Sequence, residues 1–166
     1  MKQKIFLLNM KIFIMRHGKA ALDASHDPTR PLVYHGYKES FCMASLLTKK
    51  SYKIKKILVS PYLRAQQTLI AVCQGLAFAG NIEVLLELRP NGNIAIIMCY
   101  IYSLSEIGLE NIIIISHLPL LSYLFSALCP EEIRPKFVTS SISCISFDVS
   151  TKKGILNWQM NPAEIL

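Results

Sequence analysis

The sequence lacks the cysteine patterns that stabilise small secreted proteins or bind structural zinc. Its five cysteines are odd in number and widely spaced, and no two of them form a Cys-x-x-Cys pair. The pattern favours neither a disulfide framework nor a zinc site, and it indicates a reducing, cytoplasmic location. No linker and no internal repeat divides the 166 residues, so we expect a single domain over residues 10–162.

Long uncharged apolar runs are also missing. A membrane-spanning helix needs roughly 18 such residues, and the most apolar stretch, residues 118–128, contains Pro119 and two serines. The N-terminus resembles a signal peptide only weakly, because Lys11 interrupts the apolar residues and no small-residue cleavage site follows. We therefore expect no contact with a membrane, and residues 1–9 to be an N-terminal extension, with Met10 as an alternative start.

Acidic residues are the minority among the charged ones. The chain has 18 Lys and Arg against 11 Asp and Glu, a net charge of +7. The basic residues are scattered, they are not interleaved with aromatic residues, and no nucleic-acid-binding motif is present. The charge therefore indicates a solvated surface, and we expect no nucleic acid partner. With 52% hydrophobic residues, the chain is also not of the disordered type.

Strand and helix patterns alternate along the chain. Apolar runs typical of strands occupy residues 11–15, 57–59, 82–86 and 112–115, and a closing hairpin is expected from residues 142–147 and 155–158. Helices are expected over residues 34–47, 61–78, 93–104 and 119–128. Ser60 is expected to cap the second helix, and Gly154 to supply the hairpin turn. This order predicts an α/β layered domain, with a mostly parallel central sheet flanked by helices on both faces.

Cationic and titratable residues follow three of the predicted strands. Arg16 and His17 follow the first strand, Arg64 lies shortly after the second, and His117 follows the strand over residues 112–115. Ligands of open α/β sheets bind outside the carboxyl ends of the strands. Gly18 lets the chain turn away sharply at this point. We therefore expect these side chains to form one site.

Arg64 falls in the first turn of its predicted helix, where the positive end of the helix dipole disfavours a cation. An anion should offset it. A bound phosphate would do so through a bidentate contact with the guanidinium group, and an ion pair with Asp or Glu at the surface is the alternative.

The two strand-end histidines suit phosphoryl chemistry. Either one alone would more often be a hydrogen-bonded core residue, but together they predict a site in which a neutral imidazole attacks phosphorus. Arginines and a second histidine can then hold the phosphoryl oxygens. His26 and His35 lie in or beside the polar loop over residues 20–31, where we expect exposure to solvent. Neither forms a metal-ligand spacing with the other histidines.

Three motifs carry a family resemblance. They are Met15-Arg16-His17-Gly18, Ser60-Pro61-Tyr62-Leu63-Arg64-Ala65-Gln66-Gln67-Thr68 and Ser116-His117-Leu118-Pro119. In this order they resemble the histidine phosphatase superfamily (branch 1), whose signature is Arg-His-Gly near the amino terminus. Residues 20–23, 30–32 and 157–160, and the absence of a large helical insert, resemble the SixA-type bacterial phosphohistidine phosphatases. The resemblance extends from Met10 to Pro162 and implies a phosphoglycerate mutase-like fold.

The resemblance also implies roles for the site residues. His17 would attack phosphorus, Arg16 and Arg64 would clamp the phosphoryl oxygens, and His117 would add a donor. Glu87 is placed like the general acid of the wider superfamily, with Asp27 or water as alternatives. No metal and no cofactor are implied. Lys19 departs from the pattern, because many relatives have an acidic residue after Arg-His-Gly.

The implied substrate is a phosphohistidine on another protein, such as a histidine-containing phosphotransfer domain of a two-component phosphorelay or a phosphocarrier protein. We expect a monomer, whose open site favours a macromolecular substrate. The alternatives are a small phosphomonoesterase of the same superfamily and a non-catalytic phosphate-binding protein.

Overall fold

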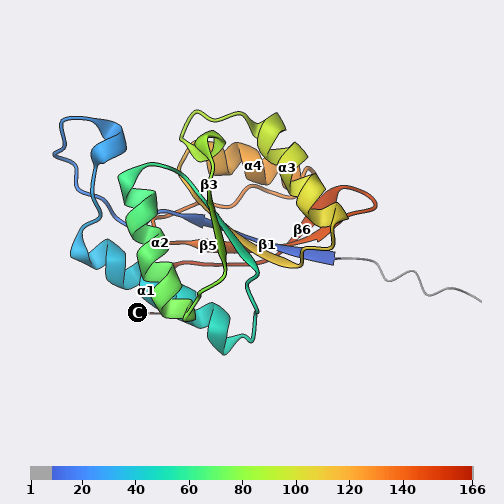
Figure 1. The fold of residues 1–166 in the computed structure, drawn as a ribbon, viewed down its shortest axis with the longest axis horizontal. Helices are drawn as coiled ribbons and strands as arrows, with labels where there is room; N and C mark the ends of the chain where they lie inside the picture. Colours follow the sequence, from blue (N-terminus) through green and yellow to red (C-terminus); the bar gives the residue numbers. More distant parts are fainter. Residues whose placement is uncertain (1–8, 166) are drawn as a thin grey trace, which may run out of the picture.

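The computed structural model describes residues 9–165 and contains one mixed β-sheet with helices on both of its faces (Figure 1). The extension expected over residues 1–9 lies, apart from Asn9, outside the described residues. Within the described part, the strands are β1 (Asn9–Arg16), β2 (Lys56–Val59), β3 (Asn81–Val84), β4 (Asn111–Ser116), β5 (Ile142–Asp148) and β6 (Lys153–Met160). The helices are α1 (Tyr34–Lys49), α2 (Leu63–Leu76), α3 (Ile94–Glu106) and α4 (Leu120–Leu128).

The sheet is mostly parallel, as predicted. Its strand order is β3-β2-β4-β1-β5-β6, and the pairs β3–β2, β2–β4 and β4–β1 are parallel. The last two strands form the expected hairpin, and β5 pairs antiparallel with β1. Because β1, β2 and β4 are adjacent and parallel, their carboxyl ends meet at the same edge of the sheet.

Two apolar cores lie on the two faces of the sheet. Side chains alternate along β1, so that Ile12 and Ile14 pack with α3 and α4, while Phe13 and Met15 pack with α1 and α2. Figure 1 shows the two helix pairs on opposite sides of the sheet. The predicted layered fold is therefore confirmed. Within residues 9–165, no helix combines the length and the apolar character needed to cross a bilayer.

Two local predictions about turns and caps are wrong. Helix α2 begins at Leu63, because the residue before it, Tyr62, is still extended (φ −66°, ψ 139°). Ser60 therefore lies outside the cap position. Gly154 lies inside β6, opposite Phe147, and the turn falls between β5 and β6, where Lys152 has φ 57°. A Cβ at position 154 would lie 2.6 Å from Ile145 Cγ2, so this glycine permits close packing.

The strand that was expected over residues 82–86 is also shorter in the structure. It ends at Val84, and a 3-10 helix, η2 (Leu86–Leu88), follows. Two more 3-10 helices, η1 (Asp27–Thr29) and η3 (Pro162–Glu164), lie in the loop after β1 and after β6.

Candidate active site

A cleft of about 430 Å³ opens at the carboxyl edge of the sheet. Four predicted residues gather at this edge: Arg16, His17 and Arg64 line the cleft, and the His117 ring lies 5.0 Å from that of His17. A larger hollow of about 890 Å³ lies elsewhere, beside the β5–β6 turn, and none of these residues lines it. The chemistry of the side chains, and not the size of the hollow, therefore identifies the candidate site.

His17 is held in the tautomer that leaves one nitrogen free to react. It follows β1 directly, and its main-chain N–H donates to the Ser116 carbonyl at 3.0 Å. Its Nδ1 lies 2.7 Å from the Gly18 carbonyl, which can only accept, so Nδ1 carries the proton. Nε2 is left with a lone pair, toward which Arg64 Nε donates at 3.3 Å.

The surroundings of His17 keep it neutral. Burial lowers its pKa most, the Gly18 hydrogen bond opposes this, and Arg64, Arg16 and Arg30 lower it further by charge repulsion, to about 4. At neutral pH the imidazole is therefore unprotonated at Nε2, as a nucleophile must be.

Arg64 is almost fully buried at the start of α2 and is bound by the loop that covers it. Its exposed fraction is 4%, and its guanidinium group donates to Asp27 twice, to the carbonyl at 2.6 Å and to Oδ2 at 3.1 Å. The anion expected beside Arg64 is thus, in the free protein, a carboxylate. Because the same guanidinium also contacts Nε2 of His17, it is placed to hold an oxygen of a group bound to that nitrogen.

Arg16, the last residue of β1, precedes His17 and also lines the cleft. Its NH1 donates to the Phe137 carbonyl at 2.8 Å, and its buried Nε has no hydrogen-bond partner among residues 9–165. Burial and the nearby charge of Arg64 lower the pKa of Arg16 from its ordinary value, but the guanidinium stays charged. An unpaired guanidinium N–H beside His17 is suited to an anionic ligand.

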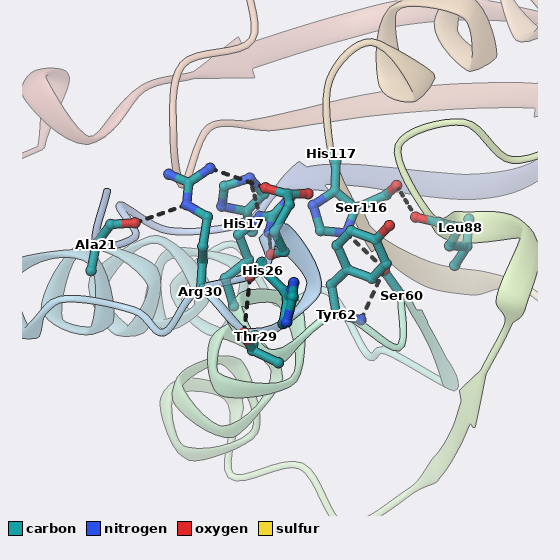
Figure 2. A network of polar contacts seen from close by, with 12 residues as sticks. His17, Ala21, His26, Thr29, Arg30, Ser60, Tyr62, Leu88, Ser116 and His117 are labelled. Atoms are coloured by element: carbon teal, nitrogen blue, oxygen red, sulfur yellow. Dashed lines mark hydrogen bonds and ion pairs between the residues drawn. The ribbon is translucent and has the colours of Figure 1, made fainter. Parts of the chain in front are cut away.

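His117 shares its surroundings with His17 and Ser60. Its Nε2 lies 2.7 Å from Ser60 Oγ, its Nδ1 is buried without a partner in the described part of the chain, and its ring packs against Tyr62 at 5.1 Å. Figure 2 shows its ring between Ser60 and His17. Burial lowers the pKa of His117 most, and with nearby positive charges it falls to about 3.

A shared hydroxyl and close helix packing fix the loop after His17. Thr68 Oγ1 accepts from the Gly18 N–H at 2.9 Å and donates to the Arg64 carbonyl at 2.7 Å, so one hydroxyl joins the nucleophile loop to α2. Helix α1 also packs closely against this loop, because a Cβ at Gly36 would lie 2.3 Å from the Lys19 carbonyl oxygen.

Asp27 and Arg30, from the polar loop, also line the cleft. Asp27 Oδ1 pairs with Arg30 at 3.2 Å, while Oδ2 pairs with Arg64. Partial burial raises the pKa of Asp27, but hydrogen bonds from Arg64 and Arg30 outweigh it and leave the pKa below its usual value. Asp27 is therefore an ionised carboxylate. Sequence reasoning named it only as an alternative acid and missed Arg30, because a loop without periodicity does not show which side chains turn inward.

Glu87 is not brought to the site. It belongs to η2, where its Oε2 accepts a hydrogen bond from the Asn93 N–H at 2.9 Å, and it does not line the cleft. The chain turns back tightly here, since a Cβ at Gly92 would lie only 1.6 Å from the Glu87 carbonyl oxygen, and Asn93 lies within reach of the Glu87 carboxylate. Glu87 therefore does not join the four other predicted site residues, which are Arg16, His17, Arg64 and His117.

Lys19 lines the cleft and is exposed, adding a fourth cation to those of Arg16, Arg30 and Arg64. His26 and His35 are exposed, as predicted. The cleft is therefore strongly cationic around a neutral imidazole, an arrangement that can bind a phosphoryl group and accept it on nitrogen.

The fold and this site together define the class to which the protein belongs, the histidine phosphatase superfamily. No protein-family model matches the sequence. The chain is 45% identical over 156 residues to the phosphohistidine phosphatase SixA of Escherichia coli strain K12, covering 94% of this chain and 96% of that protein. A solved structure of the protein histidine phosphatase SixA complexed with tungstate matches with a TM-score of 0.91 and 44% identity, over 95% of this chain and 100% of that one.

A more distant structure supports the fold alone. Phosphoglycerate mutase from Bacillus anthracis aligns with a TM-score of 0.73 at 14% identity, over 90% of this chain and 92% of its own. The expected phosphoglycerate mutase-like fold is thus confirmed. With the high identity and coverage given above, the chain belongs to the SixA family of phosphohistidine phosphatases.

Proposed function

We propose that this protein removes phosphoryl groups from phosphohistidine residues of other proteins, through a phosphohistidine formed on His17. The observation that carries this proposal is the state of His17, whose Nε2 is unprotonated and lies beside Arg64 in a cationic cleft. Membership of the SixA family supports the substrate class.

In the first step, the lone pair of His17 Nε2 attacks phosphorus, and the bond between phosphorus and the substrate imidazole breaks. The electron pair of that bond returns to the substrate nitrogen. Arg16 and Arg64 hold the equatorial phosphoryl oxygens during the transfer, where each such donor contributes about 10²- to 10³-fold in rate.

In the second step, water attacks phosphorus and the bond to His17 breaks, which releases inorganic phosphate. The Gly18 carbonyl keeps the proton on Nδ1 of His17 throughout. The departing ring is therefore a neutral imidazole and not an imidazolate, so it needs no further proton. The attacking water loses its proton to the phosphate or to solvent.

The first step needs no strong general acid. The conjugate acid of imidazole has a pKa of about 6.5, so a phosphohistidine leaving group is easily protonated by water. Of the carboxyl groups considered, Glu87 lies outside the cleft and Asp27 is ionised and bound by two arginines. We therefore propose that solvent supplies the proton, and that Asp27 orients Arg64 and Arg30.

We also propose that the reaction needs no metal ion or cofactor. The arginines supply the positive charge that Mg²⁺ supplies in many phosphoryl-transfer enzymes. Activity that persists in excess EDTA would support this, and activity restored only by added Mg²⁺ or Mn²⁺ would contradict it.

The substrate and cellular setting belong to the same proposal. We propose that a monomer acts in the cytoplasm on a histidine-containing phosphotransfer domain of a two-component phosphorelay, or on a phosphocarrier protein. The five free cysteines suit a reducing compartment. The cleft is open and edged by the exposed Leu22, which suits a protein surface better than a small metabolite.

The test uses a phosphotransfer domain labelled on histidine with ³²P. The wild-type protein should release labelled phosphate and pass through an acid-labile phosphoenzyme, and His17→Ala should do neither, because no other nucleophile lies at this position. His35→Ala, which removes an exposed histidine, is the matched control and should behave like the wild type. Faster hydrolysis of an alkyl phosphate would favour a phosphomonoesterase, and binding without turnover a phosphate-binding protein.

A further inference from the structure

Ser60 is a buried hydroxyl that contacts His117 and has no part in the reaction described so far. Its exposed fraction is 0% and that of His117 is 1%. Ser60 Oγ lies 2.7 Å from His117 Nε2 and accepts a hydrogen bond from the Tyr62 N–H at 3.3 Å. The hydroxyl therefore links the end of β2 to the histidine whose ring lies beside that of His17.

The position of this hydroxyl is fixed by its own backbone. The Ser60 N–H donates to the Ile115 carbonyl at 3.1 Å, and the Ser60 carbonyl accepts from Gln66 Nε2 at 2.6 Å. Ile115 lies near the end of β4, and His117 directly follows that strand, so Ser60 and His117 are tied to the same pair of strands. The distance between Oγ and the ring thus follows from the sheet.

Only one tautomer of His117 gives the Ser60 hydroxyl an acceptor for its hydrogen and also presents an N–H at Nδ1 of the ring. If Nε2 carried the proton, Ser60 Oγ would accept from Nε2 and from Tyr62, and no acceptor among its hydrogen-bond contacts would remain for its own hydrogen. Nδ1 would then present a lone pair to an anionic ligand, which is repulsive. If Ser60 donates to Nε2 instead, the Ser60 hydroxyl, His117 Nε2 and the Tyr62 N–H all have hydrogen-bond partners. Nδ1 of His117 then carries an N–H that has no partner in the described chain.

We propose that Ser60 is a positioning residue that holds His117 in the Nδ1–H tautomer, so that this N–H donates to an oxygen of the transferring phosphoryl group. The inference rests on the proposed function, because the acceptor is the phosphoryl group that passes to His17. It explains why a buried polar nitrogen lacks a partner in the free protein: the partner arrives with the substrate.

The first test compares two serine variants. Ser60→Ala removes the donor to His117, whereas the control Ser116→Ala removes an equally buried hydroxyl that precedes His117 and donates to the Leu88 carbonyl at 2.6 Å. An outer hydrogen bond that orients a metal-bound histidine is worth about 10- to 100-fold in activity, and we expect an effect of the same order for Ser60. We expect Ser60→Ala to lose about 10- to 100-fold in kcat on a phosphorylated phosphotransfer domain with little change in KM, and Ser116→Ala to lose much less. Ser60→Thr, which retains a hydroxyl, should recover part of the rate.

The second test needs no activity. In the full chain labelled with ¹⁵N-histidine, two-bond ¹H–¹⁵N correlation spectra should show His117 protonated at Nδ1 in the wild type and in Ser116→Ala. In Ser60→Ala the Nε2–H form should appear. Wild-type His117 protonated at Nε2, or equal rate losses in the two alanine variants, would overturn the proposal. If the wild type shows the expected tautomer but does not hydrolyse phosphohistidine, the proposed function fails and the role of Ser60 in setting the tautomer stands.

Discussion

The two buried histidines should make the fold sensitive to mild acid. Burial is the largest cause that lowers the pKa of both, and neighbouring arginines add to it, so the folded values are about 4 for His17 and about 3 for His117. In the unfolded chain both return to about 6.5. Between pH 6.5 and these folded values the unfolded chain binds a proton on each ring and the folded protein does not, so stability falls as pH falls.

The size of the effect follows from the two pKa differences. Between pH 7 and pH 5, a histidine with these values loses about 2 kcal/mol of unfolding free energy, so the pair accounts for about 4 kcal/mol. This is a large part of the 5 to 15 kcal/mol that stabilises a typical domain. Asp27 contributes little in this range, because hydrogen bonds from Arg64 and Arg30 hold its pKa below the ordinary acidic value of an Asp carboxyl, and it stays ionised at both pH values.

Equilibrium unfolding in urea at pH 7 and pH 5 measures this loss directly. His17→Asn retains an N–H for the Gly18 carbonyl but cannot titrate, so it should remove about half of the pH dependence. The double variant with His117→Asn should remove most of it, and the exposed control His35→Asn should leave the contribution of the two buried rings unchanged. A wild-type loss below about 1 kcal/mol, or an undiminished loss in the double variant, would refute the assignment of two neutral buried histidines.

Three further substitutions test the clamp, the acid and the support of the cleft. Arg64→Lys keeps the charge but not the planar fork, so phosphohistidine hydrolysis should slow by about 10²- to 10³-fold, and a near-normal rate would show that Arg64 serves only its ion pair with Asp27. Glu87→Gln should change the rates on phosphohistidine and on an alkyl phosphate by the same small factor, and a selective loss on the ester would restore Glu87 as the acid. Gly36→Ala places a Cβ 2.3 Å from the Lys19 carbonyl oxygen, so thermal unfolding should show a loss of about 1 to 3 kcal/mol, and unchanged stability would contradict the tight packing of α1 on this loop.

The sequence was sufficient to predict the sheet and the convergence of four site residues. The apolar runs of β1, β2 and β4 mark buried parallel strands, and parallel strands bring their carboxyl ends to one edge. Arg16, His17 and His117 are therefore placed together by topology alone. Arg64 reaches the same edge of the sheet because it lies in the first turn of the helix after β2.

Contacts made by irregular segments could not be predicted in the same way. Asp27 reaches Arg64 across 37 residues from a loop without periodicity, and Ser60 meets His117 across 57 residues. The position of Glu87 after a predicted strand suggests a residue of the site, but Glu87 belongs to the 3-10 helix η2 and its carboxylate contacts Asn93. The position of Gly154 after two lysines predicts a turn, whereas close packing against Ile145 is what requires a glycine there. Each of these depends on tertiary neighbours that local sequence does not specify.

The acid sensitivity and the proposed chemistry have the same physical origin. A nucleophilic imidazole must be neutral, and here burial and the surrounding arginines keep His17 neutral at the expense of stability in acid. A bound oxyanion adds negative charge beside both rings and should raise the pKa of His17 and of His117. Tungstate, chosen because a SixA structure holds it, should therefore stabilise the wild type more at pH 5 than at pH 7, with proton uptake on binding that calorimetry in buffers of different ionisation enthalpy can measure. Equal stabilisation at both pH values would mean that the anion binds away from the histidines, and the cleft would then not be the phosphoryl site.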